Sequence, residues 1–219
     1  MKKENKLSLI FGICLIVAFV LWTVLVKFID VKAIGPNNSS VGFAAFNEFV
    51  HNLTGVNWVM YSITDWLGIV AIAVAAGFAI FGLVQLIIRK SLRKVDYNIL
   101  ALGVFYIAVI AIYVLFEFVV VNYRPTLIDG RLEASYPSST TMLILCIMPT
   151  AIMQFNWHIK NKPLKISVIS VSAAFTAFTV IGRIVSGVHW ISDIIGGALF
   201  SVGIVLIYYY FCKKQSLNS

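Results

Sequence analysis

Residues 99–121 read ILALGVFYIAVIAIYVLFEFVVV, an apolar run in which Glu117 is the one charged side chain. A transmembrane α-helix needs about 20 predominantly apolar residues to cross the hydrocarbon core of a bilayer. Five further runs in the chain have a similar length and composition. The six predicted spans are residues 7–26, 66–88, 99–121, 138–156, 166–186 and 191–211. The pattern therefore predicts an all-α bundle of six transmembrane helices.

The composition agrees with an integral membrane protein. Of the 219 residues, 60% are hydrophobic and 12% are charged, whereas an ordinary soluble domain has about 25% charged residues. These values exclude a water-soluble globular enzyme, a disordered tail and a disulfide-built secreted module. The three cysteines lie in or beside apolar runs, and no pair has the spacing of a metal site. We expect one integral membrane domain over residues 1–219, with the site-bearing part at about 99–211.

The 17 lysines and arginines outnumber the 9 acidic residues and give a net charge of +8. Such an excess can indicate nucleic-acid binding, but in a membrane protein it is first compared with the positive-inside rule. With a cytoplasmic N-terminus, 12 basic residues fall inside and 5 outside. We therefore expect both termini in the cytoplasm, and we assign the excess charge to orientation, with no nucleic-acid partner.

The longest loop, residues 27–65, carries a further apolar pattern. Phe43, Phe46 and Val50 recur at helical spacing after the turn-rich stretch 35–40. This spacing predicts a short helix on the membrane surface, which either covers a site or fills the interface.

Polar residues that are costly in a membrane gather at one end of the predicted bundle. Arg124 follows the third span, and a hydroxyl-rich stretch beginning at Ser138 opens the fourth. Arg183 ends the fifth span, while His189 and Asp193 begin the sixth. Because successive spans alternate in direction, all of these ends lie at one membrane face. The charge count makes it the extracytoplasmic face.

Each residue type in this group suits the chemistry of phosphate. Arginine offers phosphate oxygens a planar fork that is always charged. The helix start at Pro137-Ser138 offers hydroxyls and free backbone N–H groups to an anion. His189 and Asp193 are four residues apart, so the carboxylate can accept a hydrogen bond from one imidazole nitrogen and leave the other free to attack. The group predicts phosphoryl transfer through a phosphohistidine, without a metal site.

These residues resemble the three motifs of the type 2 phosphatidic acid phosphatase (PAP2) superfamily. The motifs read Arg124-Pro125, then Pro137-Ser138, then Arg183-x5-His189-x3-Asp193. The resemblance implies metal-independent, cofactor-free dephosphorylation of lipid phosphates or isoprenoid diphosphates. It implies His189 as nucleophile and Asp193 as the carboxylate that orients it. The phosphate ligands that it implies are Arg124, Ser138 and Arg183. To these we add the neighbouring hydroxyl of Ser139.

Two positions depart from the family pattern. Glu117 stands where the first motif has a lysine, and it would repel a phosphate unless it is protonated or paired with Arg124 or Arg131. Thr140 stands where the second motif has a histidine that acts as general acid, and a threonine hydroxyl is a poor proton donor at neutral pH. A general acid contributes about 10²–10⁴ in rate, and its loss matters most for a poor leaving group.

The leaving group therefore separates the candidate substrates. An alcohol that leaves from a phosphomonoester must be protonated, whereas a lipid monophosphate that leaves from a diphosphate has a second pKa of about 6, by analogy with phosphoserine. We expect a preference for a polyprenyl diphosphate, such as undecaprenyl diphosphate, over phosphatidic acid. The expected location is a bacterial plasma membrane, with the site facing outside.

Two other function classes stay open at this point. Thr140 and Glu117 also fit a relative that binds a lipid phosphate with weak or no turnover. Six spans also suit a small transporter, although a transporter is expected to have polar groups near the bilayer midplane and interrupted helices. The polar groups here gather at span ends, which disfavours transport.

Overall fold

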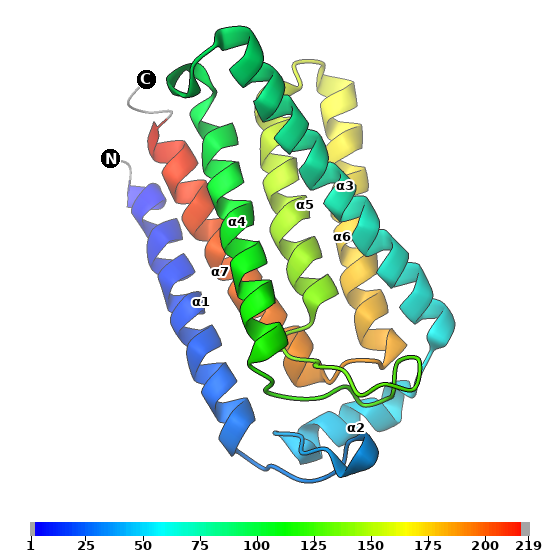
Figure 1. Ribbon diagram of the computed structural model, residues 1–219. Helices are drawn as coiled ribbons and strands as arrows, with labels where there is room; N and C mark the ends of the chain where they lie inside the picture. Colours follow the sequence, from blue (N-terminus) through cyan, green and yellow to red (C-terminus); the bar gives the residue numbers. More distant parts are fainter. Residues whose placement is uncertain (1–2, 216–219) are drawn as a thin grey trace.

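The computed structural model describes residues 3–215, and its regular structure within that range is helical (Figure 1). Six helices are long and apolar enough to cross a membrane. They are α1 (Lys3–Phe28), α3 (Trp58–Arg89), α4 (Tyr97–Phe118), α5 (Ser139–His158), α6 (Lys162–Ser186) and α7 (Ile191–Gln215). The remaining elements are α2 (Ala44–Thr54) and the short 3₁₀ helices η1 (Pro36–Asn38) and η2 (Leu92–Lys94). The predicted six-span, all-α architecture is confirmed.

Several span boundaries differ from the sequence prediction: α1, α6 and α7 each extend four residues further at one end, to Lys3, Lys162 and Gln215. α3 begins at Trp58 instead of residue 66, because the Asn57 side chain caps it by accepting a hydrogen bond from the Met60 N–H at 2.9 Å. α4 ends at Phe118, and residues 119–121 continue the apolar run outside the helix. The helix ends before the apolar run does, because Val119 has non-helical backbone angles and begins the loop.

The short helix predicted in the first long loop is present as α2. It lies across the end of the bundle opposite to both chain ends (Figure 1). Its Asn47 is fully buried, donates to Ser192 Oγ at 2.9 Å and accepts from the Ser192 N–H at 3.1 Å. Phe49 and Leu53 of the same helix are exposed. α2 is therefore docked onto the first turn of α7 and leaves an apolar side uncovered.

α1 and α7 pack along each other through a close backbone approach. A Cβ added at Gly12 would lie 2.9 Å from the Gly203 carbonyl oxygen and 2.8 Å from Ile207 Cγ1. At the far end of the pair, Trp22 Nε1 donates to the Ser192 carbonyl at 2.9 Å. The core beside these helices also contains aromatic side chains of α1, α7 and the loop before α5. This packing sets the position of the first turn of α7.

Gly12→Ala should destabilise the bundle, because the new methyl group forces α1 and α7 apart. Overpacking of this kind costs about 1–3 kcal/mol. The matched control is Gly103→Ala in α4, where an added Cβ meets nothing within 4 Å. Thermal unfolding in detergent, followed by circular dichroism, should give a lower midpoint for Gly12→Ala only. Equal midpoints for the two variants would contradict the close approach.

Candidate active site

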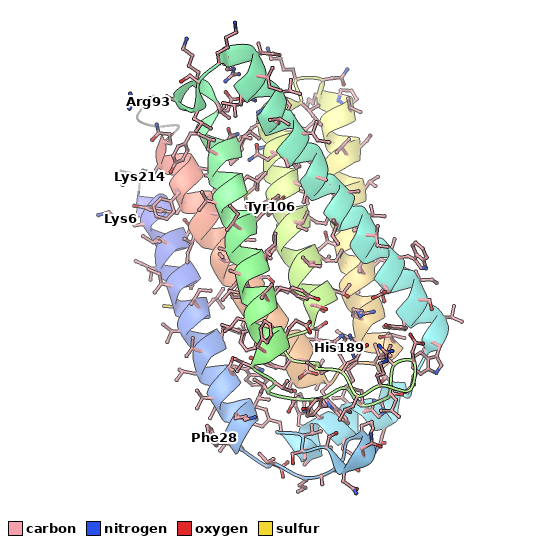
Figure 2. The ribbon with its side chains drawn as sticks, viewed as in Figure 1. Lys6, Phe28, Arg93, Tyr106, His189 and Lys214 are labelled. Atoms are coloured by element: carbon pink, nitrogen blue, oxygen red, sulfur yellow. The ribbon has the colours of Figure 1, made fainter. Side chains whose placement is uncertain are left out.

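His189 lies in the short connection between α6 and α7, at the end of the bundle that α2 covers (Figure 2). α6 is capped by Gly187, which has a φ of +63°, and a Cβ at this position would clash with the Gly55 carbonyl oxygen. Glycine is therefore required there by both conformation and space. The tight connection places His189 between Arg183 in the last turn of α6 and Asp193 in the first turn of α7.

The loop between α4 and α5 supplies further side chains to the site. Two of its segments pair in antiparallel fashion: the Arg124 N–H donates to the Glu133 carbonyl at 3.0 Å, and the Ser135 N–H donates to the Asn122 carbonyl at 2.9 Å. Alternate residues of an extended segment share a side. Asn122, Arg124 and Ser135 are all buried, as is His189.

His189 Nε2 faces two guanidinium groups. It is 3.2 Å from Arg124 NH1 and 3.5 Å from Arg183 NH2. Burial, followed by the positive charges of Arg124 and Arg183, holds the pKa of His189 well below its ordinary value of 6.5. The imidazole is therefore neutral at pH 7, as a nitrogen nucleophile must be.

Residues of α3 hold Arg183 in place. Its NH1 donates to Thr64 Oγ1 at 3.2 Å, its NH2 is 3.6 Å from Asp65 Oδ1, and its guanidinium lies 5.0 Å from the centre of the Tyr61 ring. Arg183 is 1% exposed, and its Nε has no hydrogen-bond partner. A fixed and buried guanidinium with an unused donor is suited to an anion.

The second arginine, Arg124, forms its ion pair with a residue that the sequence analysis did not consider. Arg124 Nε is 3.1 Å from Glu133 Oε2, although not in hydrogen-bonding geometry, so Glu133 pairs with it instead of Glu117. Glu117 is exposed in the last turn of α4 and lines the site cavity. The position of the family lysine is thus occupied by a carboxylate that lines the site cavity.

The direct hydrogen bond predicted between His189 and Asp193 is not formed. Ser135 Oγ lies between them, 3.0 Å from His189 Nδ1, and donates to Asp193 Oδ2 at 2.5 Å. The prediction placed both residues in one helix, but α7 begins at Ile191 and His189 precedes it. The two side chains therefore do not have the spacing of residues one helical turn apart.

The three residues at the start of α5 point in different directions. Ser138 is fully buried: its Oγ is 3.0 Å from Thr141 Oγ1, and its N–H donates to the Asp193 carbonyl at 3.1 Å. Ser139 lines the site cavity. Thr140 is buried against α3, with its methyl carbon 3.7 Å from the position of a Cβ at Gly68. Ser139 is the predicted hydroxyl that the structure brings to the cavity.

A cavity of about 520 Å³ adjoins His189. Its wall includes Arg124, Ser135 and Ser139 together with the carboxylates Glu117 and Glu133. Tyrosine and phenylalanine side chains of α4 complete it, so its polar end continues into an apolar wall. Among residues 3–215, no three histidine, cysteine or carboxylate side chains are grouped to hold a metal ion.

Sequence reasoning missed several residues of the site. Asn122 Nδ2 donates to Asp193 Oδ1 at 3.1 Å, and Ser135 bridges to His189. Thr64 and Asp65 hold Arg183 from α3. The sequence could have indicated Asn122, because it lies two positions before Arg124 and alternate residues of an extended chain share a side.

Arg124→Gln should raise the pKa of His189 toward 6.5, because a positive charge that opposes protonation is removed. Arg131→Gln is the control, since Arg131 is an exposed residue of the same loop. The measurement is an NMR titration of protein labelled with ¹⁵N-histidine, with His189→Gln used to assign the signal. An unchanged His189 titration in Arg124→Gln would contradict the electrostatic contact.

Comparison with known proteins gives one family match and one structural match. A family model described as the PAP2 superfamily matches residues 117–217. The fold is similar to the crystal structure of a transmembrane PAP2 type phosphatidylglycerolphosphate phosphatase from Bacillus subtilis, with a TM-score of 0.59 and 20% identity over 94% of this chain and 96% of that chain. No curated protein matches the sequence. Residues 117–217 therefore resemble the PAP2 superfamily, and the chain is an integral membrane protein with the fold of that transmembrane PAP2 phosphatase.

Proposed function

We propose that this chain is a PAP2-type lipid phosphate phosphatase and that it acts through a phosphohistidine at His189. The observation that carries the proposal is the position of His189 Nε2, 3.2 Å from one guanidinium and 3.5 Å from another. A phosphate held by Arg124 and Arg183 would present its phosphorus to this nitrogen. The two positive charges would stabilise the negative charge that develops on the transferred phosphoryl group.

The reaction has two steps. His189 Nε2 attacks phosphorus, so that an N–P bond forms while the bond from phosphorus to the leaving oxygen breaks. Water then attacks the phosphohistidine, the N–P bond breaks, and inorganic phosphate leaves with the imidazole restored. Ser139, at the cavity wall, is the hydroxyl that we assign to a phosphate oxygen.

We further propose that the preferred substrate is a polyprenyl diphosphate. Thr140 occupies the family's general-acid position but faces Gly68 of α3, and it does not line the cavity. The one histidine that lines the cavity beside Arg124 is His189. A leaving lipid monophosphate needs no proton, whereas the alcohol of phosphatidic acid does. The absence of a histidine acid on this wall therefore favours the diphosphate.

We also propose that the site faces outside the cell and that both termini are cytoplasmic. Figure 2 shows Lys6, Arg93 and Lys214 at the end of the bundle opposite to His189. The positive-inside rule assigns the end rich in lysine and arginine to the cytoplasm. The substrate phosphate would then be reached from the outer leaflet of the plasma membrane.

The decisive experiment compares three lipids in mixed micelles: undecaprenyl diphosphate, phosphatidic acid and phosphatidylglycerolphosphate. The kcat/KM for phosphate release should be highest for the diphosphate, by about 10²-fold or more over phosphatidic acid, which is the size of a missing general acid. Faster release from phosphatidic acid would overturn the proposed preference. The third lipid is included because the similar Bacillus subtilis protein is named for it.

His189→Ala is the control for catalysis and should abolish phosphate release and ³²P labelling of the protein. Wild-type activity should persist with a metal chelator, because arginines supply the charge at the phosphate. A wild-type chain no faster than His189→Ala on all three lipids would instead identify a lipid-phosphate-binding relative without turnover.

Glu117→Gln should lower the KM for the diphosphate, because it removes a negative charge from the wall that receives the anion. Glu117→Asp keeps the charge and serves as the control. The KM should fall in Glu117→Gln at low ionic strength, and the difference should shrink when salt screens the cavity. A KM that rises in Glu117→Gln would show that the carboxylate aids binding.

A further inference from the structure

We propose that Ser135 is a positioning residue of the reaction, which transmits the hydrogen bond of Asp193 to His189 and keeps the imidazole proton on Nδ1. The inference rests on the proposed function, in which His189 Nε2 is the nucleophile. Ser135 belongs to none of the three sequence motifs. It lies in the loop between α4 and α5, is 2% exposed and contacts both partners.

The direction of the two hydrogen bonds follows from counting protons. The Ser135 hydroxyl has one proton, and the Asp193 carboxylate can only accept. The proton is therefore donated to Asp193 Oδ2 at 2.5 Å, which leaves Ser135 Oγ to accept from His189 Nδ1 at 3.0 Å. His189 must then carry its proton on Nδ1.

The opposite side of the ring requires the same tautomer. His189 Nε2 faces NH1 of Arg124 and NH2 of Arg183, and guanidinium groups have donors only. A proton on Nε2 would point at two other donors. The lone pair is therefore on Nε2, where the attack on phosphorus begins, and the two sides of the ring independently agree.

The loop holds Ser135 where this relay needs it. The Ser135 N–H donates to the Asn122 carbonyl, and Asn122 Nδ2 donates to Asp193 Oδ1. One loop pair therefore reaches both oxygens of the carboxylate. Asp193 also accepts from the Trp190 N–H at 3.1 Å and from Ser192 Oγ at 3.3 Å. With four donors around it, the carboxylate has no neighbour that requires it to be protonated.

The relay matters most after the attack. When Nε2 forms its bond to phosphorus, the ring becomes positively charged while the proton stays on Nδ1. Ser135 then links this cation to Asp193, because its hydroxyl accepts from Nδ1 and donates to the carboxylate. His189 and Asp193 have no direct hydrogen bond that would do this. When water breaks the N–P bond, the lone pair returns to Nε2 and the Nδ1 proton is still in place.

The first test uses a pair of variants with the same shape. Ser135→Thr keeps the hydroxyl, and Ser135→Val replaces it with a methyl group of similar size. The kcat on the diphosphate should be about 10- to 100-fold lower for Ser135→Val than for Ser135→Thr, the range found when hydrogen-bond partners of a reactive histidine are removed at metal sites. The KM should differ little within the pair. Equal kcat values, high or low, would overturn the role of the hydroxyl.

The second test does not depend on turnover. In protein labelled with ¹⁵N-histidine, the His189 signals, assigned with His189→Gln, should show the Nδ1–H tautomer in the wild type. In Ser135→Ala the Nδ1–H resonance should shift, because this N–H loses its acceptor. An Nε2–H tautomer in the wild type, or an unchanged spectrum in Ser135→Ala, would overturn the inference. An inactive wild type with the expected spectra would refute the proposed function, and with it the role of Ser135 in the reaction, and would support only the tautomer assigned to His189.

Discussion

The carboxylate of Asp193 is fully buried at the end of the bundle, and the surrounding structure is organised around the hydrogen bonds that it requires. An unpaired charge in such a place would cost several kcal/mol. Ser135 and Asn122 of the loop, the Trp190 N–H and Ser192 of α7 all donate to it. α2 joins the same network through the contact of its Asn47 with Ser192. The hydrogen-bond network of this one buried carboxylate thus connects the α4–α5 loop, the start of α7 and α2 beside His189.

The positive charges of the site are held more rigidly than exposed arginines would be. Arg183 is packed on Tyr61 and bonded to Thr64, and Arg124 is paired with Glu133 at the wall of the cavity. Both Nε atoms are buried without a hydrogen-bond partner. Two neighbouring guanidinium groups repel each other, so an anion between them would relieve the repulsion. Under the proposed function this anion is the substrate phosphate, and the same two charges help to keep His189 neutral.

The two halves of the site depend on different parts of the fold. In the proposed reaction the nucleophile lies in the connection between α6 and α7, and its partners belong to α6, α7 and the paired loop. The leaving group would lie against the end of α4 and the start of α5. Successive residues of a helix point about 100° apart, so Ser139 faces the cavity and Thr140 faces α3. Ser138, just before the helix, donates its N–H to Asp193 of α7 and has its hydroxyl against Thr141. The rotation of α5 therefore decides which of the three can reach a substrate.

The sequence by itself determined the six spans and the end of the bundle at which the polar residues meet. Span number follows from the length of apolar runs, and the shared end follows from the alternating direction of the helices. The short distance along the chain from Arg183 to Asp193 likewise brought these residues near His189. The tertiary structure alone decided that Ser135 lies between His189 and Asp193, and that Thr64 holds Arg183. These contacts depend on the course of a loop and on the rotation of whole helices, which neither hydrophobic periodicity nor motif spacing specifies.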